Sequence, residues 1–562
     1  MADDALQEAL KNLKAEFEAG HVKVRDVETI NEMGRVRVCA DGTIDLHTVG
    51  PRVRSLARVA HFVRSRSALK DTPLREVQSL YMESLECAFG HLLPEMVQRK
   101  LTPGQFAKEI SGDPAAVKPF EASFKDLFDQ IQEFWNTSGP IVHAHLEDAD
   151  TLKAVYGGDV FPPFGSRVAT SVGLYMDTLV LPDPLQRTAS LADCAFTPVL
   201  LEQVLRHGLT ALSYRDLILA DVDPPLVVIA PDRFLTEEFS ARLVTTSGEA
   251  DALKHFQCLF GREFDDLDSV SEYTGSVDSA DELLERIIQP ERLLFDTDVT
   301  GNAAERLAEY LAFVQRQFKE GALPDQPGHV VMHHVVGRML QANVVLTRAG
   351  QLGGTPIVEA PTSWQYLLWK YEYDAGRSRD ILGVSTDAFV TKALQVGGSL
   401  ALQLLNRVDP QALIELRKRG AMNELRTTFR EGIGQISVAS AATLKAVTAR
   451  VSGNIESAFK RHIEEVERHR AAHTRFYGYA VGRFLGTAGL TLAAVAVANP
   501  VLSLLAAGVG VVGGIPTARD LWRRAKDLAD AGRELRRTPI AILHGAARVA
   551  QKRGISSLRD RH

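Results

Sequence analysis

Two short apolar runs, "LYMDTLVLPDP" (174–184) and "PPLVVIAPD" (224–232), decide the fold expected for the middle of this 562-residue chain. Each is rich in aliphatic residues and bounded by Asp and Pro, a texture typical of a buried strand. Helical patterns lie between such runs, and this alternation predicts an α/β or α+β domain over residues 138–300. Two further runs of the same texture and one helical pattern complete the region: "GPIVHAHL" (139–146), "RLLFDTD" (292–298) and "FTPVLLEQVLRHGLTALSY" (196–214).

Helical periodicity dominates on both sides of this domain, so the chain is predicted to be mainly α with a central α/β or α+β region. Residues 1–137 form a predicted helical domain, interrupted by a hairpin around Asp41-Gly42. Residues 301–435 form a second helical domain. Its aromatic run "SWQYLLWKYEYD" (363–374) is interpreted mainly as core packing, because several of its large residues share one helix face.

The remainder of the chain divides into three predicted segments: a long helix (436–483), an apolar hairpin (484–516) and a basic amphipathic tail (517–562). The long helix carries one apolar stripe with a mean spacing near 3.67 residues, as expected for a straight helix. From Ala441 to Tyr479 it would extend roughly 55–60 Å at about 1.5 Å per residue. We expect it to act as a stalk for the hairpin.

The hairpin segment "FLGTAGLTLAAVAVANPVLSLLAAGVGVVGGIP" (484–516) has 33 residues without a charge and an Asn-Pro pair near its middle. A single bilayer crossing needs about 20 apolar residues, so the segment exceeds one span and falls short of two. Its Ala and Gly residues permit close helix packing, either in a membrane or in the core of a large soluble protein. For a membrane-inserting role we single out Phe484, Gly489, Ala494, Asn499, Pro500, Leu505, Gly510 and Gly514.

The tail after the hairpin is basic, with twelve Lys and Arg against five Asp and Glu, although the whole chain has a net charge of −7. A positive flank beside an apolar segment favours contact with anionic lipid headgroups, and an acidic partner protein would be served by the same charges. An amphipathic pattern over 518–537 supports either interpretation. The predicted headgroup-binding residues are Arg519, Trp522, Arg523, Arg524 and Lys526.

Acidic and histidine residues supply the candidates for chemistry. Asp183, Asp232, Asp296 and Asp298 follow predicted strands, where carboxylates can converge on a divalent metal ion. The alternative is ordinary turn and cap chemistry, which the Pro residues beside several of these acids favour. His143, His145 and Glu147 would lie on one face of a strand and are metal-ligand candidates, with a solvated strand end as the alternative.

The sequence lacks the motifs that usually indicate several common classes of enzyme. It contains no Walker A motif, no GxSxG elbow and no GxGxxG after a predicted strand. Cys39, Cys87, Cys194 and Cys258 are scattered, which fits a reducing compartment, and the acidic N-terminus does not read as a secretory signal. We therefore expect a cytoplasmic protein without a cofactor, and no pattern indicates nucleic-acid binding.

The general layout, a large mixed body followed by a long helix, an apolar hairpin and a basic tail, is similar to that of membrane-acting effectors of bacterial immunity and of helical pore-forming toxins. The likeness is one of architecture and involves no shared motif. It implies a conditional membrane-acting protein, more a binder than an enzyme, which meets lipid at the inner membrane on activation. A protein partner or self-association is expected. The alternative is a cytosolic metal- or phosphate-dependent enzyme, or a scaffold, with a buried hairpin.

Overall fold

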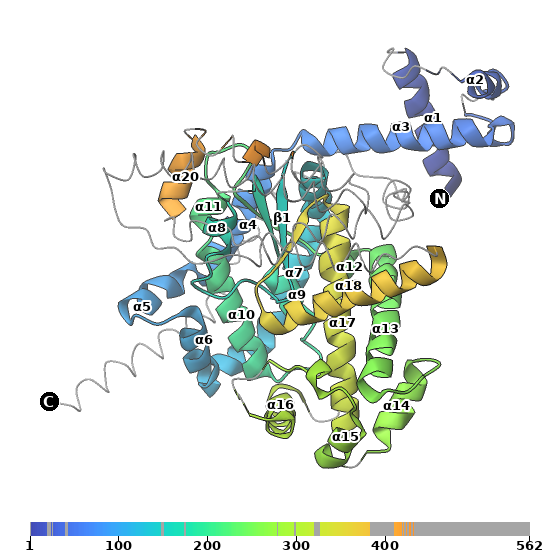
Figure 1. Ribbon diagram of the computed structural model, residues 1–562. Coiled ribbons are helices and arrows are strands. Elements are labelled where there is room, and N and C mark those ends of the chain that lie inside the picture. Colours follow the sequence, from blue (N-terminus) through green and yellow to red (C-terminus); the bar gives the residue numbers. More distant parts are fainter. Residues whose placement is uncertain are drawn as a thin grey trace.

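The computed structural model describes residues 2–382, apart from short gaps at 19–23, 25, 40–42, 148–150, 174–175, 278, 297–298, 300 and 320–325, and parts of 410–431. This part of the chain is mostly helical and contains a small parallel sheet, which confirms the predicted mainly α architecture with an α/β region (Figure 1). The predicted domain limits stay a prediction. The predicted stalk, hairpin and tail lie outside the described residues.

The N-terminal residues pack around their own small core. Helix α1 (Ala2–Glu18) lies along α3 (Pro51–Lys70), and α2 (Val27–Met33) packs beside α3. Between α2 and α3, Val38 pairs with Ile44 in a single antiparallel bridge, and the predicted turn at Asp41-Gly42 lies outside the described residues. Figure 1 shows this group projecting from one corner of the molecule, with α3 leading into the main body.

The central sheet has four parallel strands in the order β3-β2-β1-β4. Its strands are β1 (Lys153–Gly157), β2 (Thr178–Pro182), β3 (Val227–Ala230) and β4 (Thr355–Val358). Nearly every strand residue is buried, as expected for a parallel sheet covered by helices on both faces. The runs at 174–184 and 224–232 thus form β2 and β3 as predicted, whereas β1 and β4 were not predicted.

Helices before and between the first three strands share one large core with the sheet. They include α4 (Leu74–Phe89), α6 (Pro103–Ser111), α7 (Pro114–Leu146) and α10 (Thr197–Leu212), with shorter helices α5 (Leu93–Gln98), α8 (Val168–Val172), α9 (Pro184–Ala189) and α11 (Arg215–Ile218). The prediction of a strand at 139–146 is wrong, because this run is the last part of α7. Six apolar or small residues in eight fit a buried helix end as well as a strand, and here the helix continues through Pro140.

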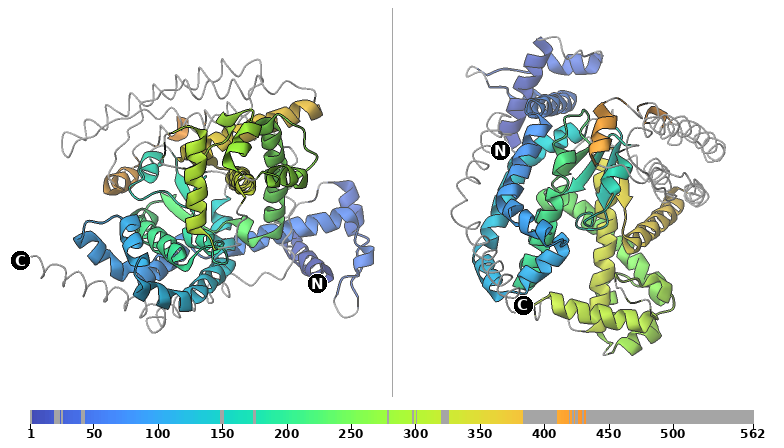
Figure 2. Two further views of the ribbon diagram at one scale, coloured as in Figure 1. Left: turned by 90° about the horizontal axis from the view of Figure 1, so that it is seen from below. Right: turned by 90° about the vertical axis from the view of Figure 1, so that its left-hand side faces the viewer.

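A largely helical insertion connects β3 to β4. It comprises α12 (Arg233–Thr236), α13 (Glu238–Phe260), α14 (Leu267–Gly275), α15 (Ala280–Arg286), α16 (Ala303–Gln317) and α17 (Pro327–Gln351), and α18 (Pro361–Leu382) follows β4. Much of it surrounds a second core, to which α18 contributes Tyr366, Trp369 and Tyr373. The aromatic run is therefore core packing, as its spacing indicated. Figure 2 shows the insertion as a distinct body of helices beside the sheet.

Side chains from helices also complete the edges of the small sheet. β3 is an edge strand, and the buried Gln78 of α4 makes two hydrogen bonds of 2.9 Å with the backbone N–H and carbonyl of Ile229. The amide thus replaces a missing neighbour strand. Helix α20 (Pro410–Lys418) brings the Arg417 guanidinium to the carbonyl groups of Met176 and Asp177, which precede β2.

Two buried histidines hold the extended segment after the 3-10 turn at Pro290–Arg292, where a strand had been predicted. His255 Nε2 contacts the carbonyl of Arg292 at 3.0 Å, and His334 Nε2 contacts that of Leu294 at 2.7 Å. The Nδ1 atoms lie 2.9 Å from the hydroxyl groups of Tyr373 and Tyr310, respectively. Each ring therefore donates from Nε2 and accepts at Nδ1, which is the pattern of a neutral imidazole.

We expect the free energy of unfolding to decrease as the pH falls from about 6.5 towards 3. Burial lowers the pKa of both His255 and His334 to about 3, so the unfolded chain binds more protons in this interval. At pH 5 each histidine should cost about 2 kcal/mol, from about 1.4 kcal/mol per pKa unit. Urea denaturation of full-length protein between pH 7.5 and 5 measures the loss.

The contribution of one ring is isolated by His334→Gln. This variant should be less stable at pH 7.5 and should show a shallower pH dependence, by up to one proton, than wild type. The exposed His47→Gln serves as the control and should keep the wild-type slope. An unchanged slope in His334→Gln would show that this histidine does not carry the effect.

Candidate functional site

The carboxyl edge of the sheet carries an acidic residue after each strand. Strands β1, β2 and β3 follow one another across the sheet, and β4 then returns to the other side of β1, so the strand order reverses between β1 and β4. Ligands of open α/β sheets bind outside the carboxyl ends of the strands, at such a switch point. This edge is therefore the candidate site, and its four acids are Asp159, Asp183, Asp232 and Glu359.

Asp183 lies fully buried at the end of β2 and caps the N-terminus of α9. Its carboxylate accepts hydrogen bonds from the Tyr81 hydroxyl at 2.8 Å, from the Trp135 indole, and from the backbone N–H groups of Leu185 and Gln186. Burial raises the pKa of Asp183, and these hydrogen bonds act in the opposite direction. Four donors occupy the carboxylate, so the structural role that the sequence left open is the one that its surroundings support.

Asp232 lies at the end of β3 between two guanidinium groups. Arg187 Nε is 2.6 Å from one carboxylate oxygen and Arg348 Nη1 is 3.2 Å from the other. Burial raises the pKa of Asp232, but the two arginines outweigh burial and lower it overall. Arg187 Nη1 also donates to the carbonyl of Asp159 at 2.6 Å, which links the ends of β3 and β1. Asp232 is therefore an ionised group in a buried charge cluster.

The other two acids singled out in the sequence do not join this cluster. Asp296 is exposed, follows the extended segment held by the two histidines, and pairs with Arg338. Asp298 lies outside the described residues. The sheet thus brings Asp183 and Asp232 to one edge, as their positions after β2 and β3 predicted. Asp296 lies on the β1 side, where its negative charge contributes to raising the pKa of Asp159.

A second polar group, which sequence reasoning missed, lies at the switch point itself. Ser166 donates to the Glu359 carboxylate at 2.8 Å, and Ser363 donates to the carbonyl of Gly158 at 2.5 Å. Arg338 Nη1 donates to the Ser363 hydroxyl at 3.0 Å. The signal for this group was present in "AVYGGD" and "TPIVE", where a short apolar run precedes an acid, but each run was too short to stand out.

The three metal-ligand candidates lie at the C-terminal end of α7, on a helix and not on a strand. His143 is buried, His145 Nε2 lies 2.8 Å from the carbonyl of Thr72, and Glu147 pairs with both Arg66 and Arg233. Residues two apart on a helix do not face each other, so His145 is directed away from the other two. Within the described ranges, no group of three His, Cys, Asp or Glu side chains is arranged to hold a metal ion.

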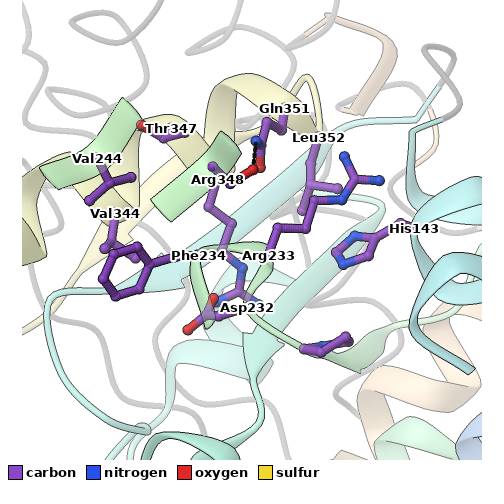
Figure 3. A pocket seen from close by; sticks show the side chains of 12 residues that line it. His143, Asp232, Arg233, Phe234, Val244, Val344, Thr347, Arg348, Gln351 and Leu352 are labelled. Atoms are coloured by element: carbon purple, nitrogen blue, oxygen red, sulfur yellow. Dashed lines mark hydrogen bonds and ion pairs between the residues drawn. The ribbon is translucent and has the colours of Figure 1, made fainter. Parts of the chain in front are cut away.

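His143 and Arg348 meet in a small pocket beside the end of β3, between α7, α12, α13 and α17 (Figure 3). Its free interior is about the size of one water molecule. The lining combines apolar side chains with polar groups: His143, Pro231, Asp232, Arg233, Phe234, Ser240, Val244, Val344, Thr347, Arg348, Gln351 and Leu352. Burial, followed by the charges of Arg233 and Arg348, lowers the pKa of His143 well below its usual value, so the ring is neutral.

The predicted membrane-inserting residues of 484–516 and the predicted headgroup-binding residues 519–526 lie outside the described residues. Among the helices that the structure describes, none has the length and hydropathy needed to cross a bilayer. Comparison with protein-family models, with curated proteins and with solved structures finds no match to this chain.

Replacing Asp183 by Ala should lower the free energy of unfolding by at least about 3 kcal/mol, because it leaves several buried donors without an acceptor, at roughly 1–3 kcal/mol each. Asp183→Asn keeps one acceptor oxygen and should cost less. The control is the exposed helix cap Asp266→Ala, for which about 1 kcal/mol is expected. Urea denaturation of the full chain compares them, and equal losses in Asp183→Ala and Asp266→Ala would contradict the central role of Asp183.

Proposed function

We propose that this chain is a conditional membrane-acting protein, of the kind found among bacterial immunity and toxin-like effectors. In this proposal the described body holds a ligand-responsive or partner-binding module. The 484–516 hairpin inserts into a membrane on activation, and the basic residues that follow it bind anionic headgroups. The single observation that carries the proposal is the run of 33 uncharged residues, followed directly by a tail of net charge +7.

Energetics support an insertion role for this run. One charge at the centre of a membrane helix costs about 2.5–3.5 kcal/mol on insertion scales, and the run contains none. Its two halves around Asn499-Pro500 have about 15 and 16 residues, enough for a hairpin that reaches about 23 Å into a bilayer. The small residues on both halves permit close packing of the two helices or of several copies.

The metal-dependent enzyme, the main alternative from the sequence, receives little support from the surroundings of its acids. Asp183 is occupied by four hydrogen-bond donors, and Asp232 is paired with two arginines. A divalent cation at either carboxylate would have to displace these partners. These partners therefore favour a structural role for both acids.

The proposal is tested by flotation of full-length protein with liposomes that contain anionic lipid, combined with release of an entrapped dye. Wild type should bind and release dye, and Leu505→Arg and Ala494→Asp should lose both activities by tenfold or more, since about 3 kcal/mol exceeds a factor of 100 at equilibrium. Deletion of residues 484–516 should behave in the same way.

The matched control is Val97→Arg, which places the same new charge on the body, at a residue that is 67% exposed on α5. This variant should bind and release dye as wild type does. Full dye release by Leu505→Arg would overturn the insertion role of the hairpin. Absence of binding by wild type, over neutral and anionic lipids and after limited proteolysis to mimic activation, would also count against it.

A further inference from the structure

The loops that follow β1 and β4 leave the sheet side by side at the switch point. The two strands are paired as far as Gly157 and Val358, so the chain continues from neighbouring positions at the carboxyl edge. Asp159 lies two residues after the end of β1, and Glu359 directly follows β4. The charges of both acids add to the effect of burial in raising the pKa of Tyr156 on β1, so its hydroxyl lies near them.

A tight turn after β1 places a serine against Glu359. The N–H of Ser166 donates to the carbonyl of Pro163 at 2.8 Å, and Gly165 has a φ of +80°, which a type II turn requires at its third residue. The hydroxyl of Ser166 lies 2.8 and 3.1 Å from the two carboxylate oxygens of Glu359. Phe164, the second residue of the turn, is 47% exposed. The turn thus holds an exposed aromatic ring close to a hydrogen-bonded carboxylate.

Tyr214 brings a further hydroxyl group to the same place. Its ring packs edge-on against Phe161, with centroids 5.5 Å apart, and the residue is 6% exposed. The hydroxyl makes no hydrogen bond of normal geometry with the described residues. Burial and the charge of Glu359 raise the pKa of Tyr214, and the Ser166 hydroxyl acts in the opposite direction, so the group is directed towards these two side chains. Buried hydroxyl groups normally have a hydrogen-bond partner, which points to a ligand oxygen at this place.

A ligand can reach these side chains from solvent. Tyr214 is buried, Ser166 and Asp159 are half-buried, and Glu359 is exposed. The tyrosine hydroxyl therefore lies on the inner side of the group and the Glu359 carboxylate on the outer side.

We propose that the switch-point site, formed by Asp159, Phe164, Ser166, Tyr214 and Glu359, binds a neutral molecule with neighbouring hydroxyl groups, either the ribose of a nucleoside or a pyranose sugar. The two carboxylates accept hydrogen bonds from ligand hydroxyl groups, and Tyr214 donates one to a ligand oxygen. Phe164 offers an apolar face to the ligand ring. Ligands of open α/β sheets bind at such a switch point, and in dinucleotide-binding folds an acid holds a ribose hydroxyl. The site is independent of the hairpin and of the proposed membrane role.

The charges near the two acids favour a neutral ligand over an ion. Burial raises the pKa of Asp159, and the positive charges of Arg206 and Arg338 oppose this effect, while Asp296 adds to it. The carboxylate of Asp159 therefore already has cationic neighbours. Within the part of the chain that the structure describes, no three His, Cys, Asp or Glu side chains are arranged to hold a metal ion. An anion would be repelled by the two carboxylates, whereas a hydroxyl group adds hydrogen bonds without changing a charge.

The experiment titrates full-length protein with the ribonucleosides and, separately, with D-glucose, D-mannose and N-acetyl-D-glucosamine. Isothermal calorimetry and the thermal unfolding midpoint are the readouts, and neither involves a membrane, so the result is separate from that of the liposome experiment. We expect saturable binding of at least one of the two classes, which identifies the source of the hydroxyl groups. Removal of one bound hydroxyl, as in a 2′-deoxynucleoside or a deoxy sugar, should weaken binding by tenfold or more.

Two results would overturn the proposal. One is the absence of saturable binding for every nucleoside and sugar in the panel. The other is stabilisation by spermidine or magnesium chloride alone, which would show that the acids bind a cation.

Variants assign the binding to the switch-point site. Glu359→Gln removes a charged acceptor and should weaken binding by tenfold or more. Tyr214→Phe removes only the hydroxyl and should weaken binding severalfold, without lowering the free energy of unfolding, since the hydroxyl has no normal partner to lose. Phe164→Ala should weaken binding and keep the stability of the fold, because the ring is exposed.

Two matched controls accompany these variants. Glu249→Gln changes an exposed acid on α13, and Phe313→Ala removes a ring that is 44% exposed on α16. Both should bind as wild type does. Unchanged binding in Glu359→Gln or in Tyr214→Phe would place the ligand elsewhere and refute the assignment.

Discussion

The buried carboxylate of Asp183 is the constraint on which the arrangement around the sheet depends. Its four donors come from three different elements: Tyr81 on α4, Trp135 on α7 and the first turn of α9. A buried carboxylate requires several hydrogen bonds to offset its loss of hydration, so these elements must meet at the end of β2. The aromatic rings of Tyr81 and Trp135 also contact each other, with centroids 5.0 Å apart, so one residue fixes both a polar and an apolar contact.

Side chains from helices also satisfy backbone groups of the sheet and of the segment that leads into it. Four strands of four or five residues cannot cover their own edges, and a free edge exposes backbone groups to pairing with other chains. Gln78 satisfies part of the β3 edge, and Arg417 satisfies carbonyl groups that lead into β2. The side chain of Gln78 thus takes the place that a further strand occupies in a larger sheet. The cost is a set of buried polar groups that only this packing satisfies.

The sequence predicted what depends on local pattern. The runs that form β2 and β3 are continuous apolar stretches bounded by Asp and Pro, and the aromatic face of α18 and the long amphipathic helices carry a helical period. It missed β1 and β4, because "KAVYG" is short and begins with a lysine, and "TPIV" contains a proline and follows a glycine pair. The end of α7 was mistaken for a strand because Gly139 and Pro140 suggest a boundary, whereas packing against the sheet keeps the helix intact.

The candidate site was predictable only in part, because only some of its residues belong to a local sequence pattern. Asp183 and Asp232 were found because they follow recognisable strands, but their partners lie far away in the chain: Arg187 is 45 residues and Arg348 is 116 residues from Asp232. No local sequence pattern indicates such a distant partner. The sequence therefore suggested carboxylates that are free to bind a cation, whereas the fold pairs Asp232 with two guanidinium groups.

Helix α17 connects this charge cluster to the second core. Its last turns carry Arg348, with Ala349 in the core of the sheet, while Val331, Val335 and Met339 lie in the core of the insertion. A helix of 25 residues is about 37 Å long and transmits a shift at one end as a rigid element. Packed cores respond to such a shift by discrete repacking. A change at the ion pair between Arg348 and Asp232 therefore acts directly on the helix that both cores share.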